Sequence, residues 1–277
     1  MTDTTQFAGK TVIVTGAAGG LGRAFAEGFA ARGANIVVAD MNEAGSHETV
    51  DLVEKAGANS SSKPRAIAVT TNVTQKASTD ALMDAALAAF GSIDVVINNA
   101  AMYATIKRAP FYELDPDEWD RVMAVNVKGA WLVSASAFPK MTQATGRIIN
   151  IASATVFSGS PMWMHYVASK GAVIGMTRVM AREVGKTGVT VNAIAPGFTL
   201  TEASLSLMED ADTYGVSSRA IPRASQPDDM VGTALFWRLR TPDTSPARPS
   251  SSMAASSSFS PLDSLLELTK EKSPCPK

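Results

Sequence analysis

Tyr166 and Lys170 are the residues of this 277-residue chain whose types and spacing point most directly to proton transfer. They are four apart in 164–185, a segment whose pattern predicts a helix, so their side chains share one face. A tyrosine with its reference pKa of about 10 is a poor base at neutral pH. We expect the lysine cation to favour the phenolate and lower that pKa. Such a pair suits an acid/base for alcohol–ketone interconversion, although the same spacing also arises by chance on surface helices.

Ser153 directly follows 147–151, an apolar, β-branched run that predicts a strand. Open α/β sheets bind ligands at the carboxyl ends of their strands. A hydroxyl there can donate a hydrogen bond to a developing oxyanion while Tyr166 moves the proton. No nearby base motif indicates a hydrolase nucleophile, and the alternative role for Ser153 is that of a turn residue at a strand end.

A glycine-rich segment, 15–22, follows the strand predicted at 11–15 and opens into a predicted helix. A dinucleotide pyrophosphate needs backbone N–H groups at a helix N-terminus, with no side chains in the way. We expect Gly16 to permit the turn, Gly20 the close approach, and Gly22 the packing of helix on strand. A plain tight turn is the alternative. The flanking strand and helix, and an acidic residue at the end of the next strand, favour the cofactor site.

Asp40 is that acidic residue, at the end of the strand predicted at 35–39. Its carboxylate can accept both ribose hydroxyls of adenosine and would repel a 2′-phosphate. Ala17 and Ala18 supply no cation for such a phosphate, so NAD(H) is expected rather than NADP(H). Asp40 or Asn42 could also cap the following helix, and the two roles are compatible.

Short apolar strands alternating with amphipathic helices must position these residues. Further strands are predicted at 66–70, 93–97 and 189–194, with helices at 75–90 and 117–138. Continuous apolar strands of this kind are typical of a parallel sheet covered on both faces. The sequence therefore predicts an α/β protein with one doubly wound domain over residues 1–236.

Six separated motifs resemble, in order and spacing, the short-chain dehydrogenase/reductase family, and the likeness covers about residues 8–236. The motifs are Thr15–Gly22, Asn98–Ala101, Asn126, Ser153, the Tyr166/Lys170 pair and Pro196–Gly197. The resemblance implies a Rossmann fold and an NAD-dependent alcohol dehydrogenase with Asn126, Ser153, Tyr166 and Lys170 as its catalytic set. The chain also resembles, more loosely, members that oxidise secondary alcohols.

The resemblance further implies roles for individual residues. Asn99 would support the central strand and the cofactor, and Asn126 would hold a water that links Lys170 to solvent. Pro196 and Gly197 would lie against the nicotinamide, and Asn72–Val73 stands where the family usually has Asp-Val beside the adenine. Together with the residue-based arguments, the expected cofactor contacts are Gly16, Gly20, Leu21, Gly22, Asp40, Asn72, Val73, Asn99, Ala100, Tyr166, Lys170, Pro196, Gly197, Thr199 and Thr201.

The expected substrate pocket is mostly apolar, which favours a neutral, largely apolar secondary alcohol or ketone. No arginine lies in the two loops nearest the expected nicotinamide, which disfavours a carboxylate or phosphate substrate. Lys107 and Arg108 lie a little beyond these loops and weaken that exclusion. Segment 198–222 is a candidate lid. The residues expected to contact substrate are Met102, Tyr103, Thr155 and Trp163.

Two other activities stay open. One is reduction of 3-oxoacyl thioesters. Reductases of that kind usually use NADPH, and Asp40 disfavours this cofactor. The other is a cofactor-binding protein without activity. Neither histidine is expected to act: His165 is predicted to be an exposed neighbour of Tyr166, His47 a solvated helix residue, and no metal site is visible.

The tail, 237–277, is rich in serine and proline and follows the last glycine of the chain, Gly232, a composition that favours disorder. The family instead ends on a strand with a Gly-Gln-Thr…Asp-Gly-Gly pattern. Codons can be chosen for residues 244–255 so that the same DNA also encodes a strand of this kind in another reading frame. Translation that starts at the third base of the first codon then gives Ile-Thr-Gly-Gln-Thr-Leu-Val-Val-Asp-Gly-Gly. We hypothesise that a single-base shift near Phe236 replaced the native C-terminus. The alternatives are a divergent tail or a functional disordered extension. The hypothesis fails if the coding DNA, read from the third base, does not encode that strand. The last edge strand is then expected to be missing, which leaves a homodimer as the expected assembly and the family's tetramer in doubt.

Composition excludes several other classes. Twenty-five Lys and Arg against 26 Asp and Glu leave a net charge of −1, which gives no basis for nucleic-acid binding. A single cysteine, Cys275, cannot form an internal disulfide. No apolar run approaches the roughly 18–20 residues that cross a bilayer, and the N-terminus lacks a signal-peptide pattern. A cytoplasmic protein with a small-molecule substrate is expected.

Overall fold

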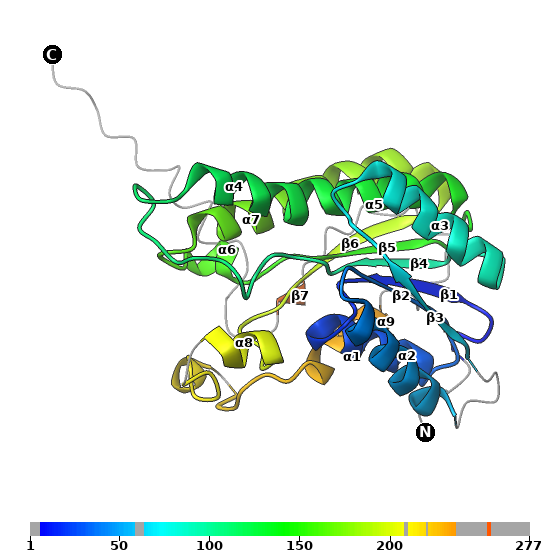
Figure 1. Cartoon of the computed structure of the whole chain (residues 1–277), viewed down its shortest axis with the longest axis horizontal. Coiled ribbons are helices and arrows are strands. Elements are labelled where there is room, and N and C mark those ends of the chain that lie inside the picture. The colour runs from blue at the N-terminus through cyan, green and yellow to red at the C-terminus, as the bar shows by residue number, and fades with distance from the viewer. Residues whose placement is uncertain (1–5, 59–63, 208–209, 220, 237–253, 256–277) are drawn as a thin grey trace, which may run out of the picture.

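The computed structural model describes residues 6–58, 64–207, 210–219, 221–236 and 254–255. One parallel sheet runs through it in the order β3–β2–β1–β4–β5–β6–β7 (Figure 1). The chain order reverses between β1 and β4, and ligands of such sheets bind at this switch point. The strands are β1 Thr11–Thr15, β2 Asn35–Asp40, β3 Ala66–Thr70, β4 Val95–Asn98, β5 Arg147–Ile151, β6 Thr190–Ala195 and β7 Ala254–Ala255.

Helices cover both faces of the sheet, with α1, α2 and α9 on one side and α3, α5 and α7 on the other (Figure 1). The predicted elements are confirmed to within a few residues. The helices are α1 Gly20–Ala30, α2 Glu43–Gly57, α3 Lys76–Phe90, α4 Pro116–Met123, α5 Ala130–Ala137, α6 Thr155–Ser158, α7 Met164–Val184, α8 Glu202–Leu207 and α9 Asp228–Phe236.

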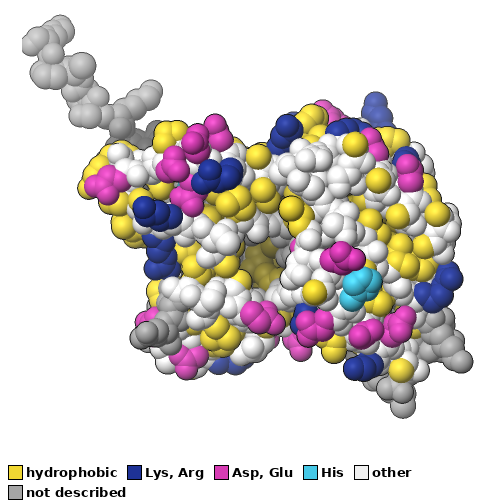
Figure 2. Space-filling view, in the orientation of Figure 1, with side chains coloured by type: hydrophobic (Ala, Val, Ile, Leu, Met, Phe, Trp, Pro, Cys, Tyr) yellow, Lys and Arg dark blue, Asp and Glu magenta, His cyan; other side chains and the backbone are white. Residues whose placement is uncertain are grey.

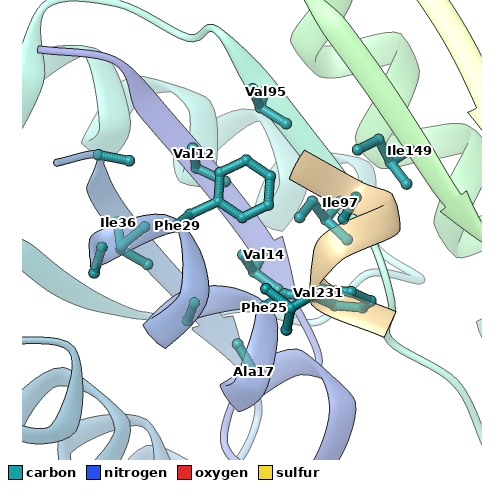
Figure 3. Packing of buried hydrophobic residues seen from close by; sticks show 14 of the residues in the cluster. Val12, Val14, Ala17, Phe25, Phe29, Ile36, Val95, Ile97, Ile149 and Val231 are labelled. Atoms are coloured by element: carbon teal, nitrogen blue, oxygen red, sulfur yellow. The ribbon is translucent and has the colours of Figure 1, made fainter. Parts of the chain in front are cut away.

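Alternate residues of each strand supply the cores on the two faces. Val12 and Val14 pack with Phe25 and Phe29 of α1, on the face where Val231 of α9 also lies (Figure 3). Ile13, between them in β1, packs on the opposite face in a second cluster with residues of α3 and α5. Because both faces are covered, every residue of β1 is buried, which explains the continuous apolar strand seen in the sequence.

The segment predicted as one helix over 117–138 contains a feature that its sequence does not reveal. A π-helical turn, Ala124–Gly129, lies between α4 and α5. Such wider turns are rare and are found frequently at functional sites. This one carries Asn126, so the irregular turn places a predicted catalytic residue.

The last place in the sheet is occupied by two residues. Ala254 and Ala255 pair in parallel with Ile194 and Ala195 of β6. The sequence predicted no strand at this edge, and the structure has the two-residue β7 there. This strand is much shorter than the others, which have four to six residues. The rest of 237–277, with most of the segment on which the frameshift hypothesis rests, lies outside the described residues, and the homodimer stays a prediction.

Within the described part of the chain, no helix has the length and apolar character needed to span a membrane.

Candidate active site

A cleft of about 1500 Å³ joins the glycine loop to the predicted catalytic residues. The space-filling view shows the molecule hollowed near its middle, with hydrophobic side chains deep in the hollow (Figure 2). The predicted site residues that line the cleft are Gly20, Leu21, Asp40, Asn99, Tyr103, Ser153, Thr155, Trp163, Tyr166, Lys170, Pro196, Gly197, Thr199 and Thr201. Gly16, Gly22, Asn72, Val73, Ala100, Met102 and Asn126 are not part of its lining.

The glycine loop forms a cradle that side chains could not share. Gly16 has φ +66°, and a Cβ there would lie 2.7 Å from the Cα of Ala100. A Cβ on Gly22 would lie 2.2 Å from the carbonyl oxygen of Gly16. No described side chain caps α1 at Gly19, so its first N–H groups stay free for a ligand. A pyrophosphate fits this cradle, because an anion is stabilised at a helix N-terminus.

Asn99 fastens the loop to the end of β4. Its Nδ2 donates to the carbonyl oxygens of Thr15 and Gly16, at 3.0 and 2.9 Å. The backbone N–H groups of Asn99 and Ala100 each donate to Oγ1 of Thr15, at 3.1 Å. This geometry fits the supporting role that the family resemblance implies for Asn99.

Asp40 is held beside the same loop. Its Oδ2 accepts the N–H of Ala18 at 3.0 Å, and its Oδ1 accepts the N–H of Asn42 at 2.9 Å. Asn42, and not Asp40, caps α2, because its side chain accepts the N–H of Gly45. The Asp40 carboxylate therefore faces the cleft with further lone pairs available to a ligand's hydroxyls.

Asn72 and Val73 are engaged elsewhere. The Asn72 side chain accepts hydrogen bonds from the N–H and hydroxyl of Thr74, at 3.0 and 2.7 Å. Val73 is buried, and a Cβ added to Gly129 would lie 2.7 Å from its side chain. Their contact with an adenine stays a prediction.

Tyr166 is buried at the start of α7, and its hydroxyl environment differs from the expected one. Burial raises its pKa, Tyr103 raises it further, and a hydrogen bond with Ser153 opposes them. The prediction of a lowered tyrosine pKa was therefore wrong, because burial was not visible in the sequence. At neutral pH Tyr166 is thus a neutral phenol that can donate its proton.

Ser153 lies between Thr155 and Tyr166. Its Oγ accepts from the hydroxyl of Thr155 at 3.0 Å and from the N–H of Thr155 at 3.3 Å. A hydroxyl that accepts two hydrogen bonds keeps its own proton for donation. Ser153 can therefore donate to Tyr166 or to a substrate oxygen in the cleft.

Lys170 is buried one helical turn beyond Tyr166. Its Nζ donates to the carbonyl oxygen of Ile151 at 2.7 Å and lies 5.7 Å from the centre of the Tyr166 ring. Burial lowers the pKa of Lys170 to about 8. Lys170 thus remains mostly cationic at neutral pH, where its charge would favour a tyrosinate.

Replacing Lys170 with methionine is expected to remove a pH dependence of stability. Lysine in an unfolded chain has a pKa of about 10.4, whereas burial lowers that of Lys170 to about 8. Between these values the unfolded chain binds one more proton, so this residue makes wild-type stability rise with pH. Measured by urea unfolding from about pH 7.5 to 10, the free energy of unfolding of the wild type should rise relative to that of the variant. Parallel stability curves would contradict the buried amine.

Asn126 holds the chain on the substrate side. Its Oδ1 accepts the N–H of Met102 at 2.7 Å, and its Nδ2 donates to the hydroxyl of Ser169 at 3.1 Å. Met102 packs beside Tyr103 and Trp163 without lining the cleft, and its contact with a substrate stays a prediction. The water expected between Asn126 and Lys170 stays a prediction.

Three aromatic rings form one wall of the cleft. The Tyr103 ring lies 5.3 Å from that of Trp163 and 5.5 Å from that of Tyr166, and the last two are also 5.5 Å apart. Such tilted contacts are favourable arrangements of aromatic rings. The predicted substrate residues Tyr103, Thr155 and Trp163 are thereby brought beside Ser153 and Tyr166.

The segment after β6 also lines the cleft, from Pro196 to Glu202. The carbonyl of Pro196 accepts the N–H of Ala154 at 2.9 Å, which fixes the start of the segment beside Ser153. The Thr201 side chain lies 3.5 Å from the position of a Cβ on Gly20. Glu202, which no sequence motif indicates, also lines the cleft. Its carboxylate lies 4.0 Å from the Cβ positions on Gly19 and Gly20.

His165 is completely buried, so its predicted exposure was wrong. Its Nε2 lies 3.6 Å from Oε2 of Glu118, because α4 covers the start of α7. Oε1 of Glu118 accepts the N–H of Lys107 at 2.9 Å. The prediction for His47 is confirmed, since its side chain is 67% exposed on α2. The described residues contain no cluster of three or more His, Cys, Asp or Glu side chains suited to a metal.

The fold and the glycine cradle define a dinucleotide-binding α/β protein, and comparison with known proteins places it more closely. The family model for short chain dehydrogenases matches residues 10–212. The chain belongs to this family of oxidoreductases.

Individual relatives differ in what their names describe. The chain is 33% identical over 246 residues to 5-keto-D-gluconate 5-reductase of Escherichia coli K12, a match that covers 88% of this chain and 93% of that protein. It is 35% identical over 239 residues to 2-dehydro-3-deoxy-D-gluconate 5-dehydrogenase of Dickeya dadantii, covering 84% and 90%. The crystal structure of 3-ketoacyl-(acyl-carrier-protein) reductase from Brucella melitensis with NADH has a TM-score of 0.74 and 28% identity, covering 85% and 92%.

Proposed function

We propose that the protein transfers a hydride between NAD(H) and a secondary alcohol or ketone whose reacting end is neutral and largely apolar. The observation that carries this proposal is one cleft that joins the glycine cradle to buried Tyr166, Ser153 and Lys170. When bound, NAD(H) supplies or accepts the hydride. The aromatic wall of Tyr103 and Trp163 supports an apolar environment for the reacting carbon.

The side chains of the cleft divide the work on the substrate oxygen. In ketone reduction, neutral Tyr166 donates its proton to the carbonyl oxygen while Ser153 donates a hydrogen bond to it. In alcohol oxidation, the tyrosinate form takes the hydroxyl proton. The Lys170 cation, one turn away, stabilises that anion. Asn126 supports both directions by holding Met102 against the helix that carries Tyr166 and Lys170.

The charges around the adenosine end support NAD(H) over NADP(H). Asp40 places a negative charge beside the glycine loop. Arg23, a cation in the same part of the cleft, donates to Glu48 at 2.8 Å and to the carbonyl oxygen of Ala18 at 2.6 Å. Because this guanidinium is already engaged with a carboxylate, a 2′-phosphate would meet Asp40 without a free cation to balance it.

Replacing Asp40 with asparagine should weaken the preference for NAD. The variant keeps the shape of the side chain and one acceptor oxygen but removes the charge that repels a 2′-phosphate. We expect the ratio of kcat/KM for NAD to that for NADP to fall at least about tenfold, which corresponds to about 1.4 kcal/mol. Asp51→Asn, which removes an exposed charge on α2 that does not line the cleft, serves as the control. An unchanged ratio in Asp40→Asn would contradict the assignment of Asp40.

Turnover of a panel of secondary alcohols and ketones tests the proposed function. With NAD, reduced cofactor should appear at 340 nm on addition of alcohols, and it should be consumed by the matching ketones. Preferred turnover of 3-oxoacyl thioesters would favour the reductase alternative, which the Brucella neighbour's description keeps open. Tight NAD binding without turnover of any compound would favour a cofactor-binding protein without activity.

A further inference from the structure

Arg108 is a cation that the proposed chemistry leaves unused. It lines the same cleft as Ser153 and Tyr166. Its guanidinium carbon lies 4.9 Å from the centre of the Trp163 ring, in a cation–π contact. Among the described residues, Arg108 has no hydrogen-bonding or ion-pairing partner. In the sequence it lies beyond the loops nearest the expected nicotinamide, whereas the fold brings it to the aromatic wall.

The backbone on both sides of Arg108 is held in place. The N–H of Lys107 donates to Oε1 of Glu118 at 2.9 Å, and the N–H of Ala109 donates to the carbonyl of Met162 at 3.2 Å. Ile106 is also buried, in the cluster that contains Trp163. An exposed arginine side chain is therefore presented by a fixed segment.

Met162, whose carbonyl accepts the N–H of Ala109, has a strained backbone conformation. It is one of the few described non-glycine residues with positive φ, at +68°. Residues in that conformation cost free energy, persist where surrounding contacts impose them, and cluster at ligand sites. The conformation of Met162 turns the chain so that its carbonyl receives Ala109 while the following residue, Trp163, meets the guanidinium.

Other basic side chains of the cleft are already engaged. Arg219 donates to the carbonyl of Phe198 at 2.7 Å and to the hydroxyl of Ser225 at 3.0 Å. Arg23 is paired with Glu48, and Lys170 donates to the carbonyl of Ile151. In the described lining, Arg108 is thus the arginine whose N–H groups remain for a ligand.

We propose that Arg108 binds an oxyanion of the substrate, a carboxylate separated from the reacting carbon, so that the natural alcohol or ketone is a hydroxy or oxo acid. A guanidinium stacked on a ring keeps its edge N–H groups free, and these match a carboxylate in a two-point contact. One arginine balances the single charge of a carboxylate, whereas a phosphate monoester carries nearly two. This inference rests on the proposed function and replaces the expectation of a wholly neutral substrate.

The test compares matched acids and esters. The substrates are secondary hydroxy acids from 3-hydroxybutanoate to 6-hydroxyheptanoate, their methyl esters, and analogues that carry a phosphate monoester in place of the carboxylate, all with saturating NAD. The wild type should prefer the best acid to its ester by at least tenfold in kcat/KM. Arg108→Gln should lower kcat/KM for that acid by about ten- to a hundredfold, mainly through KM, and for the ester by less than threefold.

The controls separate binding from folding. Lys107→Gln removes the neighbouring exposed charge, which does not line the cleft, and should leave both substrates unaffected. Arg108→Lys keeps the charge without the planar fork and should recover part of the preference for the acid. The Kd for NAD and the Tm of Arg108→Gln should match those of the wild type.

Several outcomes would overturn the proposal. Equal turnover of acid and ester by the wild type, or an equal loss for both in Arg108→Gln, would remove the carboxylate contact while leaving the proposed function standing. Preferred turnover of the phosphate analogue would show that Arg108 binds a phosphate and not the proposed carboxylate. Failure of every alcohol and ketone would instead overturn the proposed function, and this inference with it.

Discussion

Tyr166→Phe is expected to lower kcat by at least about a thousandfold, because the substrate oxygen loses the group that exchanges its proton. General acid–base groups contribute about 10²- to 10⁴-fold to such reactions. The phenyl ring keeps the contacts with Tyr103 and Trp163, whose ring centres both lie 5.5 Å from that of Tyr166. The variant therefore removes the hydroxyl from an otherwise unchanged wall. Steady-state turnover with saturating NAD and the best alcohol measures the loss.

Cofactor binding distinguishes a chemical role from a structural one. Tyr166→Phe should bind NADH with a Kd within about threefold of the wild type, by fluorescence titration, and its Tm should change little. Tyr103→Phe is the matched control, since it removes a hydroxyl from the same aromatic wall and should keep at least a tenth of the turnover. Retention of more than a tenth of kcat by Tyr166→Phe would refute its role as the acid/base.

Local patterns made much of this fold predictable. The strand at 11–15, the glycine turn and the start of α1 all depend on neighbours in sequence, and each lies where it was expected. The pairing of Tyr166 with Lys170 likewise follows from helical spacing alone. Motif order then placed Ser153 beside them, because parallel strands bring their carboxyl ends to one edge.

Burial and long-range contacts account for what the sequence did not reveal. The pKa of Tyr166 is raised because the packed aromatic cluster around it excludes water, which no local pattern encodes. His165 is buried because α4, over forty residues earlier in the chain, brings Glu118 against it. Arg108 reaches the cleft only because its neighbours are tied to Glu118 and Met162.

Gly16→Ala should destabilise the protein strongly for the addition of a single methyl group, because two effects combine. At φ +66° a side chain is strained by about 1–2 kcal/mol. The new Cβ would also lie 2.7 Å from Cα and 2.9 Å from N of Ala100, both backbone atoms that cannot rotate away. Overpacking of this kind costs about 1–3 kcal/mol. We expect the free energy of unfolding, measured in urea, to fall by about 3 kcal/mol.

Gly9→Ala separates the strain from the collision. Gly9 has nearly the same φ, +69°, but nothing lies within 4 Å of its Cβ position. It should therefore lose only the strain, about 1–2 kcal/mol, and bind NAD as the wild type does. Gly16→Ala must also displace the loop from Asn99, which holds the carbonyl of Gly16, and should weaken NAD binding at least tenfold. If both variants lost equal stability and kept their affinity for NAD, the cradle would not be where the pyrophosphate binds.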